Sequence, residues 1–111
     1  MSIDPAALEL YREVMGEEAD TFIADIVNTF IVNAPKLIEQ MEQNLNLNDN
    51  NTFIRNAHNL KSNSGTVGAT ALAKLAATLE EKGEVGNLQD LAGTLNEVKA
   101  ELAQVIIYFR K

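Results

Sequence analysis

His58 is the only histidine in this chain of 111 residues, and Lys61 follows it three positions later. A neutral imidazole attacks phosphorus readily, and the phosphoramidate that forms remains reactive enough to pass the group on. In a helix, a side chain three positions away shares the same surface, so the ammonium of Lys61 lies beside the imidazole. A fixed ammonium there favours an imidazole that carries a dianionic phosphoryl group. These two residues are therefore suited to reversible phosphoryl transfer.

The charge around His58 is positive, although the chain as a whole is acidic. Residues 52–79 contain no acidic side chain, and Arg55, Lys61 and Lys74 give this window a charge of +3 within a chain of net charge −7. Such a local field suits an anion or an acidic pocket on a partner. We expect no acid beside the histidine to be needed, because positioning and electrostatics dominate phosphoryl transfer and a partner's Mg²⁺ can supply both.

The helical pattern around His58 places its side chain on the solvent side. At about 100° per residue, the apolar side chains of this segment occupy one sector, which we expect to face the core. His58 falls about 120° from the centre of that sector, so we expect it to be exposed. The sector contains Phe53, Ala57, Leu60 and Ser64, with Val67 at its edge.

The surroundings of His58 predict a flat docking surface for another protein. Ile54 is apolar on an otherwise polar face, and Gly65 leaves a gap without a side chain. A helical glycine costs up to about 1 kcal/mol relative to alanine, and the close approach of a partner would justify that cost. The alternatives are a peripheral core position for Ile54 and a helix end at Gly65. We predict four partner contacts, namely Ile54, Arg55, Ser62 and Gly65.

Helix-like apolar spacing runs through nearly the whole chain, and strand-like alternation is hard to find. Asp4, as an N-cap, and Pro5, at the first helical position, predict the start of a short helix that stops at Gly16. The next apolar stripe predicts helical structure over residues 17–45. Within that stretch Pro35 causes either a kink or a junction between two abutting helices.

Three further helices follow. The turn "NLNDNN" supplies Asp49 or Asn51 as the cap of a third helix that reaches about Ser64, where "SGTVGA" breaks or bends it. A fourth helix, "ATALAKLAATLEEKG", ends at Gly83, and a leucine-rich seam predicts the last helix over residues 88–109. Short connections make neighbouring helices antiparallel. We therefore predict an all-α fold, an up-and-down antiparallel four-helix bundle with a short extra N-terminal helix, in one domain over residues 1–111.

The composition excludes several classes of protein. Without cysteine there are no disulfides or thiolate metal sites, and a single histidine gives little support for a transition-metal site, so we predict no metal. The net charge of −7 argues against nucleic acid or anionic lipid as a partner. We find no signal peptide and no apolar stretch near the roughly 20 residues that span a membrane. We expect a soluble, cytoplasmic monomer whose leucine seam is used internally.

The run "AHNLKSNSGTVGA" resembles the hallmark of the histidine-containing phosphotransfer (HPt) domain of two-component phosphorelays, Ala-His-x-Leu-Lys-Gly-Ser-Ser followed shortly by Leu-Gly-Ala. Val67 replaces the leucine, and Ser62 replaces the glycine that normally lets a receiver domain approach closely. The segment "FIADIVNTFIVNAPKLIEQM" is also similar to the family's long proline-containing second helix. Seven residues match the motif, namely Ala57, His58, Leu60, Lys61, Ser64, Gly68 and Ala69.

The resemblance implies that His58 accepts a phosphoryl group from the aspartate of one receiver domain and passes it to another, with Lys61 beside the phosphate. The expected partners are response-regulator receivers or a hybrid sensor histidine kinase, and Mg²⁺ is expected on the receiver, with no cofactor on this chain. Since the chain has no Gly-rich phosphate loop, we expect no ATP-dependent kinase activity. The alternative is a helical adaptor that binds a receiver or another signalling protein without taking phosphate, and Ser62 keeps this alternative open.

Overall fold

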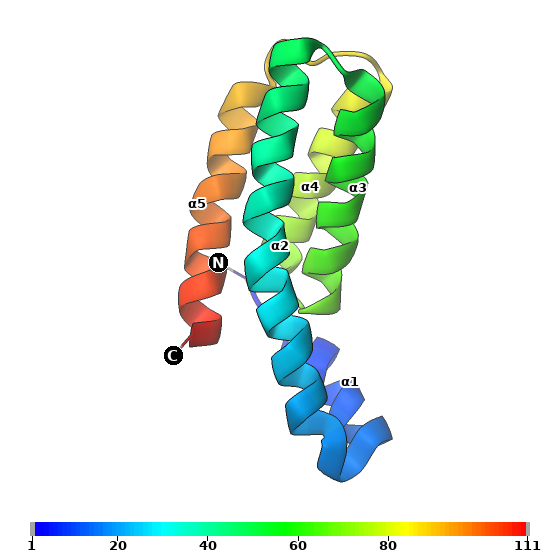
Figure 1. Cartoon of the computed structure of the whole chain (residues 1–111), viewed down its shortest axis with the longest axis vertical. Coiled ribbons are helices and arrows are strands. Elements are labelled where there is room, and N and C mark those ends of the chain that lie inside the picture. The colour runs from blue at the N-terminus through cyan, green and yellow to red at the C-terminus, as the bar shows by residue number, and fades with distance from the viewer. Residues whose placement is uncertain (1, 111) are drawn as a thin grey trace.

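The structure is a computed structural model that describes residues 2–110, and these are almost entirely helical. Four long helices run alternately up and down, and a short helix lies at one end of the bundle beside the first half of the longest one (Figure 1). The predicted all-α up-and-down bundle with an extra N-terminal helix is therefore confirmed. The elements are α1 (Ala6–Met15), the 3₁₀ turn η1 (Gly16–Glu18), α2 (Ala19–Leu47), α3 (Asn50–Thr66), α4 (Thr70–Glu84) and α5 (Leu91–Arg110).

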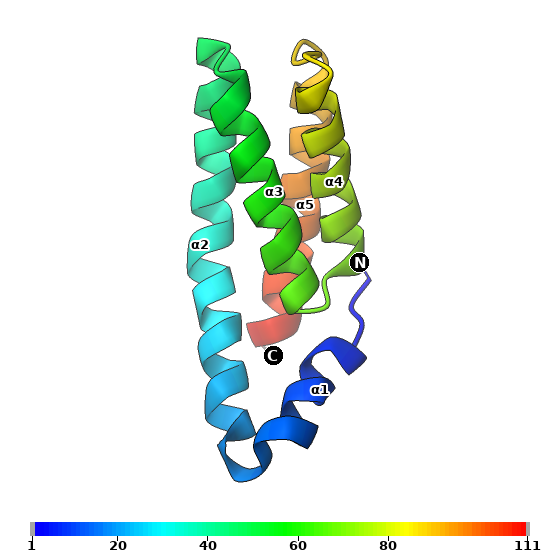
Figure 2. The same cartoon turned by 90° about the vertical axis from the view of Figure 1, so that its right-hand side faces the viewer.

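The helix that carries His58 packs between two neighbours. α3 contacts α2 on one side and α4 on the other, and α5 closes the bundle against α2 and α4 (Figure 2). Every long helix contributes fully buried side chains to one core, including Met41, Phe53, Leu72 and Leu91. The predicted leucine seam of α5 lies inside this core, so it is used within the chain.

α2 is one continuous helix that passes through Pro35, so the alternative of two abutting helices is wrong. Proline removes one backbone donor and crowds the carbonyl one turn earlier, which here belongs to Ile31. Pro35 lies on the exposed side of α2, while Ala34 and Ile38 beside it are buried. The burial of these core residues holds the helix together across the missing hydrogen bond.

The helix end predicted at Gly83 is wrong, and so is the helix end given as the alternative for Gly65. α3 continues to Thr66, so Gly65 lies inside the helix, and α4 continues to Glu84, so Gly83 is also internal. Gly83 is buried against α3, whereas a Cβ built at Gly65 would meet no atom within 4 Å. Gly83 therefore permits close helix packing, and Gly65 is an open gap on the surface.

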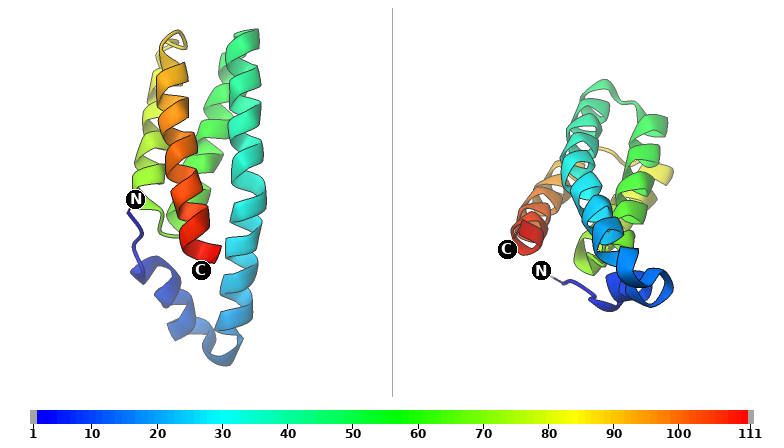
Figure 3. Two further views of the ribbon diagram at one scale, coloured as in Figure 1. Left: turned by 90° about the vertical axis from the view of Figure 1, so that its left-hand side faces the viewer. Right: turned by 60° about the horizontal axis from the view of Figure 1, so that its bottom comes forward.

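The chain turns from α3 to α4 at Gly68, where the N-terminal segment lies against it (Figure 3). Gly68 has a φ of +78°, and a Cβ there would lie 2.3 Å from the carbonyl oxygen of Asp4. The N–H of Asp4 donates to the carbonyl of Gly68 at 2.7 Å, and the N–H of Thr70 donates to the carbonyl of Ser2 at 3.1 Å. This turn therefore needs glycine both for its conformation and for the close approach of the N-terminal segment.

The helix starts follow the predicted caps with small shifts. α1 begins at Ala6 with Pro5 at its N-cap position, so the predicted cap at Asp4 and first helical residue at Pro5 are each wrong by one position. Asp4 still contacts the helix start, because its Oδ1 accepts from the N–H of Ala6 at 3.0 Å. Asp49 is the cap of α3, since its carboxylate accepts from the N–H of Thr52 at 3.2 Å. α5 begins later than predicted, and Leu88 packs against the core from the preceding loop.

One stretch of helix is long and apolar enough to cross a membrane by length and composition alone. It lies within Ala6–Leu47, and the mean hydropathy of its most apolar 18-residue window is 1.2. The core helix of a soluble protein meets the same criterion, and α2 contributes Phe30, Ala34, Ile38 and Met41 to the core. The absence of a membrane segment therefore stays a prediction.

Candidate functional site

His58 projects from the middle of α3 on the side that adjoins α4. Its side chain is 56% exposed, in agreement with the helical wheel. The Nδ1 atom lies 2.7 Å from Oε2 of Glu80 on α4. One nitrogen of the ring therefore has a protein partner, and we find none for Nε2 among residues 2–110.

Glu80 also binds Lys61, so a single carboxylate joins both candidate residues of α3. The ammonium of Lys61 donates to Oε1 of Glu80 at 2.5 Å, while Oε2 takes the contact with His58. The Glu80 side chain is only 13% exposed, whereas that of Lys61 is 37% exposed. The hydrogen bond from Lys61 and, to a smaller extent, that from His58 lower the pKa of Glu80, and burial opposes this shift. Glu80 is therefore ionised at neutral pH.

The ionised carboxylate determines which ring nitrogen of His58 carries the hydrogen. An ionised carboxylate can only accept hydrogen bonds, so Nδ1 must donate to Glu80. In a neutral imidazole the other nitrogen then keeps its lone pair, because the ring carries a single N–H. The arrangement leaves Nε2 as the nucleophilic atom on an exposed ring.

Glu80, the acid beside His58, was not predicted from the sequence, in which residues 52–79 contain no acidic side chain. Glu80 is the first residue after the acid-free window and lies 22 positions from His58. Helical periodicity could have indicated this residue, because Glu80 adjoins the buried positions Ala76, Leu79 and Gly83 and so lies at the edge of the core face of α4. An acid at the border of a core face indicates a partner on the adjacent helix.

The four predicted partner contacts differ in their surroundings. Ile54 is only partly exposed, and its Cγ1 would lie 2.9 Å from a Cβ built at Gly83, so it packs between α3 and α4 in the peripheral core position that the sequence left open. Arg55, Ser62 and Gly65 are all exposed on α3. These three residues lie one or two helical turns from His58 along α3, and their exposure leaves them available to a partner.

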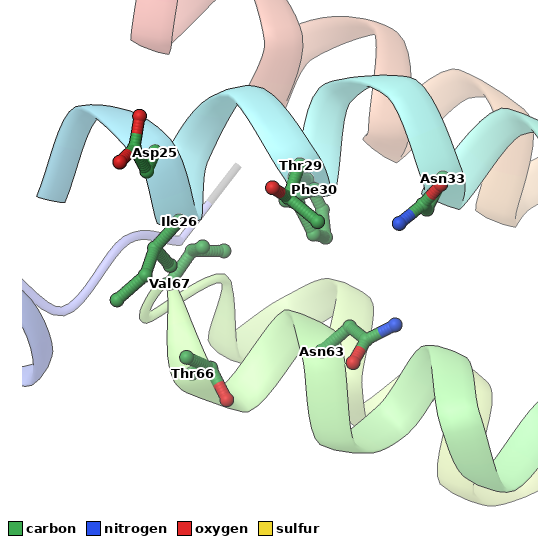
Figure 4. Close-up of a pocket in the computed structure, with 8 residues that line it drawn as sticks. All are labelled: Asp25, Ile26, Thr29, Phe30, Asn33, Asn63, Thr66 and Val67. Atoms are coloured by element: carbon green, nitrogen blue, oxygen red, sulfur yellow. The ribbon is translucent and has the colours of Figure 1, made fainter. Parts of the chain in front are cut away.

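A groove of about 310 Å³ lies between α2 and α3, separate from the contact of His58 with α4 (Figure 4). Asn33 on α2 and Asn63 on α3 project toward it, and Phe30 and Val67 form its buried floor. Among the described residues, no group of three or more histidine, cysteine or acidic side chains is placed to hold a metal ion. Asp25 of α2 also lines the groove, which therefore offers one carboxylate beside neutral polar groups and apolar surface.

Comparison with known proteins gives a family match and matches to solved structures. The family model of the Hpt domain matches residues 25–107. The crystal structure of histidine-containing phosphotransfer protein B from Pseudomonas aeruginosa PAO1 matches with a TM-score of 0.85 and 27% identity, over 97% of this chain and 90% of that chain. The histidine-containing phosphotransfer protein ZmHP2 from maize matches with a TM-score of 0.78 and 20% identity, over 92% of this chain and 84% of that chain. At 20% identity the second match shows the fold alone. No curated protein sequence matches significantly.

The family match extends from α2 to near the end of α5 and includes all of α3 and α4, so it contains His58, Lys61 and Glu80. It covers well over half of the chain and agrees with the resemblance of the motif around His58. Hpt domains work with receiver domains and histidine kinases in phosphorelays. The chain therefore belongs to the Hpt domain family, and its role is histidine phosphotransfer in a two-component phosphorelay.

Proposed function

We propose that His58 is the phosphoacceptor of this domain and that it takes the phosphoryl group on Nε2. The observation that carries the proposal is the hydrogen bond from Nδ1 to Glu80 at 2.7 Å, which leaves Nε2 free on a ring that is 56% exposed. A receiver domain would bring its aspartyl phosphate to this exposed side of α3. The chain would act as a carrier between receivers and would not phosphorylate itself from ATP.

The transfer step balances without loss of a proton from His58. The lone pair of Nε2 attacks phosphorus, the P–O bond to the donor aspartate breaks, and its electron pair returns to the aspartate carboxylate. In the onward step an oxygen of the acceptor aspartate attacks phosphorus. The N–P bond then breaks, and its electron pair returns to Nε2. Most of the catalysis in such a step is positioning and charge stabilisation, and the receiver's Mg²⁺ would supply part of both.

Lys61 would stabilise the charge of the phosphoryl group. Its ammonium lies on the same carboxylate as Nδ1 of His58 and is 37% exposed, so it can reach outward from Glu80. Arg55, Ser62 and Gly65 would contact the receiver, since they are exposed around the histidine. Ile54 would pack α3 against α4 and would not be a main contact with the partner.

The test is phosphate transfer from a phosphorylated receiver domain, with Mg²⁺, to the wild-type chain and to His58→Gln. We expect acid-labile, base-stable label on the wild type and none on the variant, because phosphohistidine has that stability and glutamine cannot form it. Circular dichroism of the variant controls for folding. Absence of label on the wild type with several receivers would contradict the proposal.

The second candidate is an adaptor that binds a receiver without taking phosphate. Ser62 favours it, since this exposed hydroxymethyl group stands where the family motif has a glycine that permits close approach. The same experiment separates the two functions when binding is measured beside transfer. Binding without label on either protein would support the adaptor, and label that depends on His58 would exclude it.

A further inference from the structure

We propose that Arg55 and Ser62 bind the phosphoryl group that His58 carries on Nε2, the arginine through its guanidinium and the serine through its hydroxyl. This inference rests on the proposed function and deepens it, since it names the groups of this chain that hold the phosphoryl group between two receivers. Both residues are exposed on α3, within one helical turn of the histidine. The role is assigned from the side of α3 on which each side chain lies.

One side of His58 on α3 faces α4. At about 100° per residue, Lys61 and Ile54 are rotated by about 60° and 40° from the histidine in the same direction. Both are turned toward α4, because the ammonium of Lys61 binds Glu80 at 2.5 Å and Ile54 packs against Gly83. A side chain rotated in this direction from the histidine therefore lies on the α4 side of the site.

Arg55 and Ser62 lie on the other side of His58. They are rotated from it by about 60° and 40° in the opposite direction. Farther round in this direction, Asn56 bonds to α2, and Asn63 projects toward the groove between α2 and α3 (Figure 4). Since Arg55 and Ser62 are exposed, they occupy the solvent-facing strip of α3 between the histidine and α2.

The imidazole ring of His58 directs Nε2 toward this strip. Nδ1 is held at 2.7 Å from Glu80 on α4, and the opposite edge of the ring, which carries Nε2, is thereby turned outward and away from α4. Side chains of a helix lean toward its N-terminus, so the ring leans over the turn that contains Arg55, and Ser62 leans from the following turn toward the ring. A phosphoryl group on Nε2 therefore lies between Arg55 and Ser62.

Both side chains have free donors of the kind that phosphate binds. Within residues 2–110, neither the guanidinium of Arg55 nor the hydroxyl of Ser62 takes part in an ion pair or a hydrogen bond. A guanidinium offers two parallel N–H donors that match two phosphoryl oxygens, and the hydroxyl can donate to a third. Lys61 shares its ammonium with Glu80 on the far side of the ring, so it acts on the phosphoryl group at longer range.

The neighbouring donors are occupied or turned elsewhere. Thr66, one turn after Ser62, donates its hydroxyl to the carbonyl of Ser62 at 3.1 Å. Lys74, the third cation of residues 52–79, belongs to α4 and so lies on the side to which Nδ1 is turned. Arg55 is therefore the cation of this positive window that lies on the side of Nε2.

The first experiment observes the guanidinium directly in the phosphorylated chain without a receiver. The chain has arginines only at positions 12, 55 and 110, so the three Nε–H signals can be separated in a ¹⁵N–¹H spectrum and assigned with Arg55→Lys. On phosphorylation we expect the Arg55 signal to shift and its hydrogen exchange with water to slow. Arg12, which is paired with Asp20, and Arg110 serve as internal controls that should not change.

The second experiment measures how the phosphoryl group is distributed at equilibrium between a receiver and this chain. At concentrations below those at which the two proteins associate, this ratio depends on the two phosphorylated states and not on the rate or strength of docking. We expect the share on this chain to fall about threefold in Arg55→Gln, as for the loss of one exposed charged contact. Lys74→Gln is the matched control, because it removes another exposed cation of the same window and should leave the ratio unchanged.

Two variants of Ser62 separate a bound hydroxyl from a steric obstacle. Ser62→Ala and Ser62→Gly both remove the hydroxyl, so both should lower the share of phosphate on this chain. If the side chain of Ser62 only hinders a receiver, Ser62→Gly would speed transfer and leave the equilibrium ratio as in the wild type. That result would contradict the assigned role of Ser62.

The outcomes distinguish failure of this inference from failure of the proposed function. If Arg55→Gln slows transfer but the ratio and the Arg55 signal do not respond, Arg55 only contacts the receiver and the inference is wrong. If Lys61→Gln lowers the ratio and Arg55→Gln does not, the phosphoryl group lies on the α4 side, which also contradicts the inference. In both cases His58 still takes phosphate. If the wild type takes no phosphate on His58, the proposed function itself fails.

Discussion

Gly83 of α4 and Ile54 of α3 face each other so closely that a Cβ built on the glycine would lie 2.9 Å from Cγ1 of the isoleucine. The contact lies one helical turn from the site on both helices, because His58 follows Ile54 by four residues and Glu80 precedes Gly83 by three. In an antiparallel pair these steps run in the same direction along the bundle. The packing of Ile54 against Gly83 therefore sets the register that brings His58 to Glu80.

Gly83→Ala should separate the two helices at this contact. Overpacking of a filled interface costs about 1–3 kcal/mol of stability, and we expect a loss in this range by urea denaturation. Ile54→Ala should cost less stability in this variant than in the wild-type chain, since it removes the Cγ1 atom that the new Cβ would meet. Additive effects in a double-mutant cycle would contradict a direct contact between the two residues.

Gly68 and Gly65 form a matched pair for testing backbone requirements. Gly68→Ala should cost more than about 1–2 kcal/mol, because Gly68 has a φ of +78° and its Cβ would meet the carbonyl of Asp4 at 2.3 Å. Gly65→Ala should stabilise the chain by about 0.5–1 kcal/mol, because Gly65 is helical and open. Thermal unfolding of both variants checks this, and similar shifts in the two would contradict it. Slower transfer by the more stable Gly65→Ala would support its predicted contact with the partner.

The buried amides of Asn44 and Asn56 join α2 to α3. Asn56 donates to the side-chain oxygen of Asn44 at 3.0 Å, and each residue is 7% exposed. Asn44→Ala leaves the amide of Asn56 without its partner, so we expect a loss of about 1–3 kcal/mol of unfolding free energy. Replacement of both by leucine should cost much less than the single change, because no polar group is then left buried. If the double variant is as unstable as Asn44→Ala, the unpaired amide of Asn56 does not account for the loss of stability.

The lowered pKa of Glu80 predicts how stability depends on pH. Because hydrogen bonding from Lys61 lowers this pKa below its ordinary value of 4.5, the ionised carboxylate stabilises the folded chain. That contribution is fully present above the unfolded value and is lost as the pH falls through the folded one. The difference in unfolding free energy between wild type and Glu80→Gln should therefore shift against the wild type below pH 4.5. A difference that stays constant down to the acid transition would exclude the ion pair as its cause.

The hydrogen bond between Nδ1 and Glu80 also predicts the isomer of phosphohistidine. Since Nδ1 is occupied, the phosphoryl group should attach to Nε2 in the wild-type chain. Nitrogen–phosphorus couplings on ¹⁵N-histidine-labelled protein distinguish the two isomers. Phosphorylation at Nδ1 would require Glu80 to release the ring and would contradict the arrangement seen in the structure.

The sequence predicted much of the architecture, because helices, caps and a core face depend on neighbours within a few residues. The exposure of His58, the burial of Phe53 and Leu60, and the cap at Asp49 all followed from helical periodicity and local hydrogen bonding. Helix ends did not follow from the sequence in the same way. The predicted end at Gly83 and the alternative end at Gly65 are both wrong, because glycine stops a helix in many contexts but is also found inside helices, where it permits close packing or leaves an open gap.

What stands opposite His58 was decided only by the tertiary structure. The amino-acid sequence by itself supplied an exposed imidazole with Lys61 beside it, since both lie on one helix at fixed spacing. The contact with Glu80 spans 22 residues and depends on the register of α4 against α3. That register comes from side-chain packing such as that of Ile54 against Gly83, which no helical period expresses. Local periodicity thus determined which side chains are exposed, and packing between helices determined which charge controls the histidine.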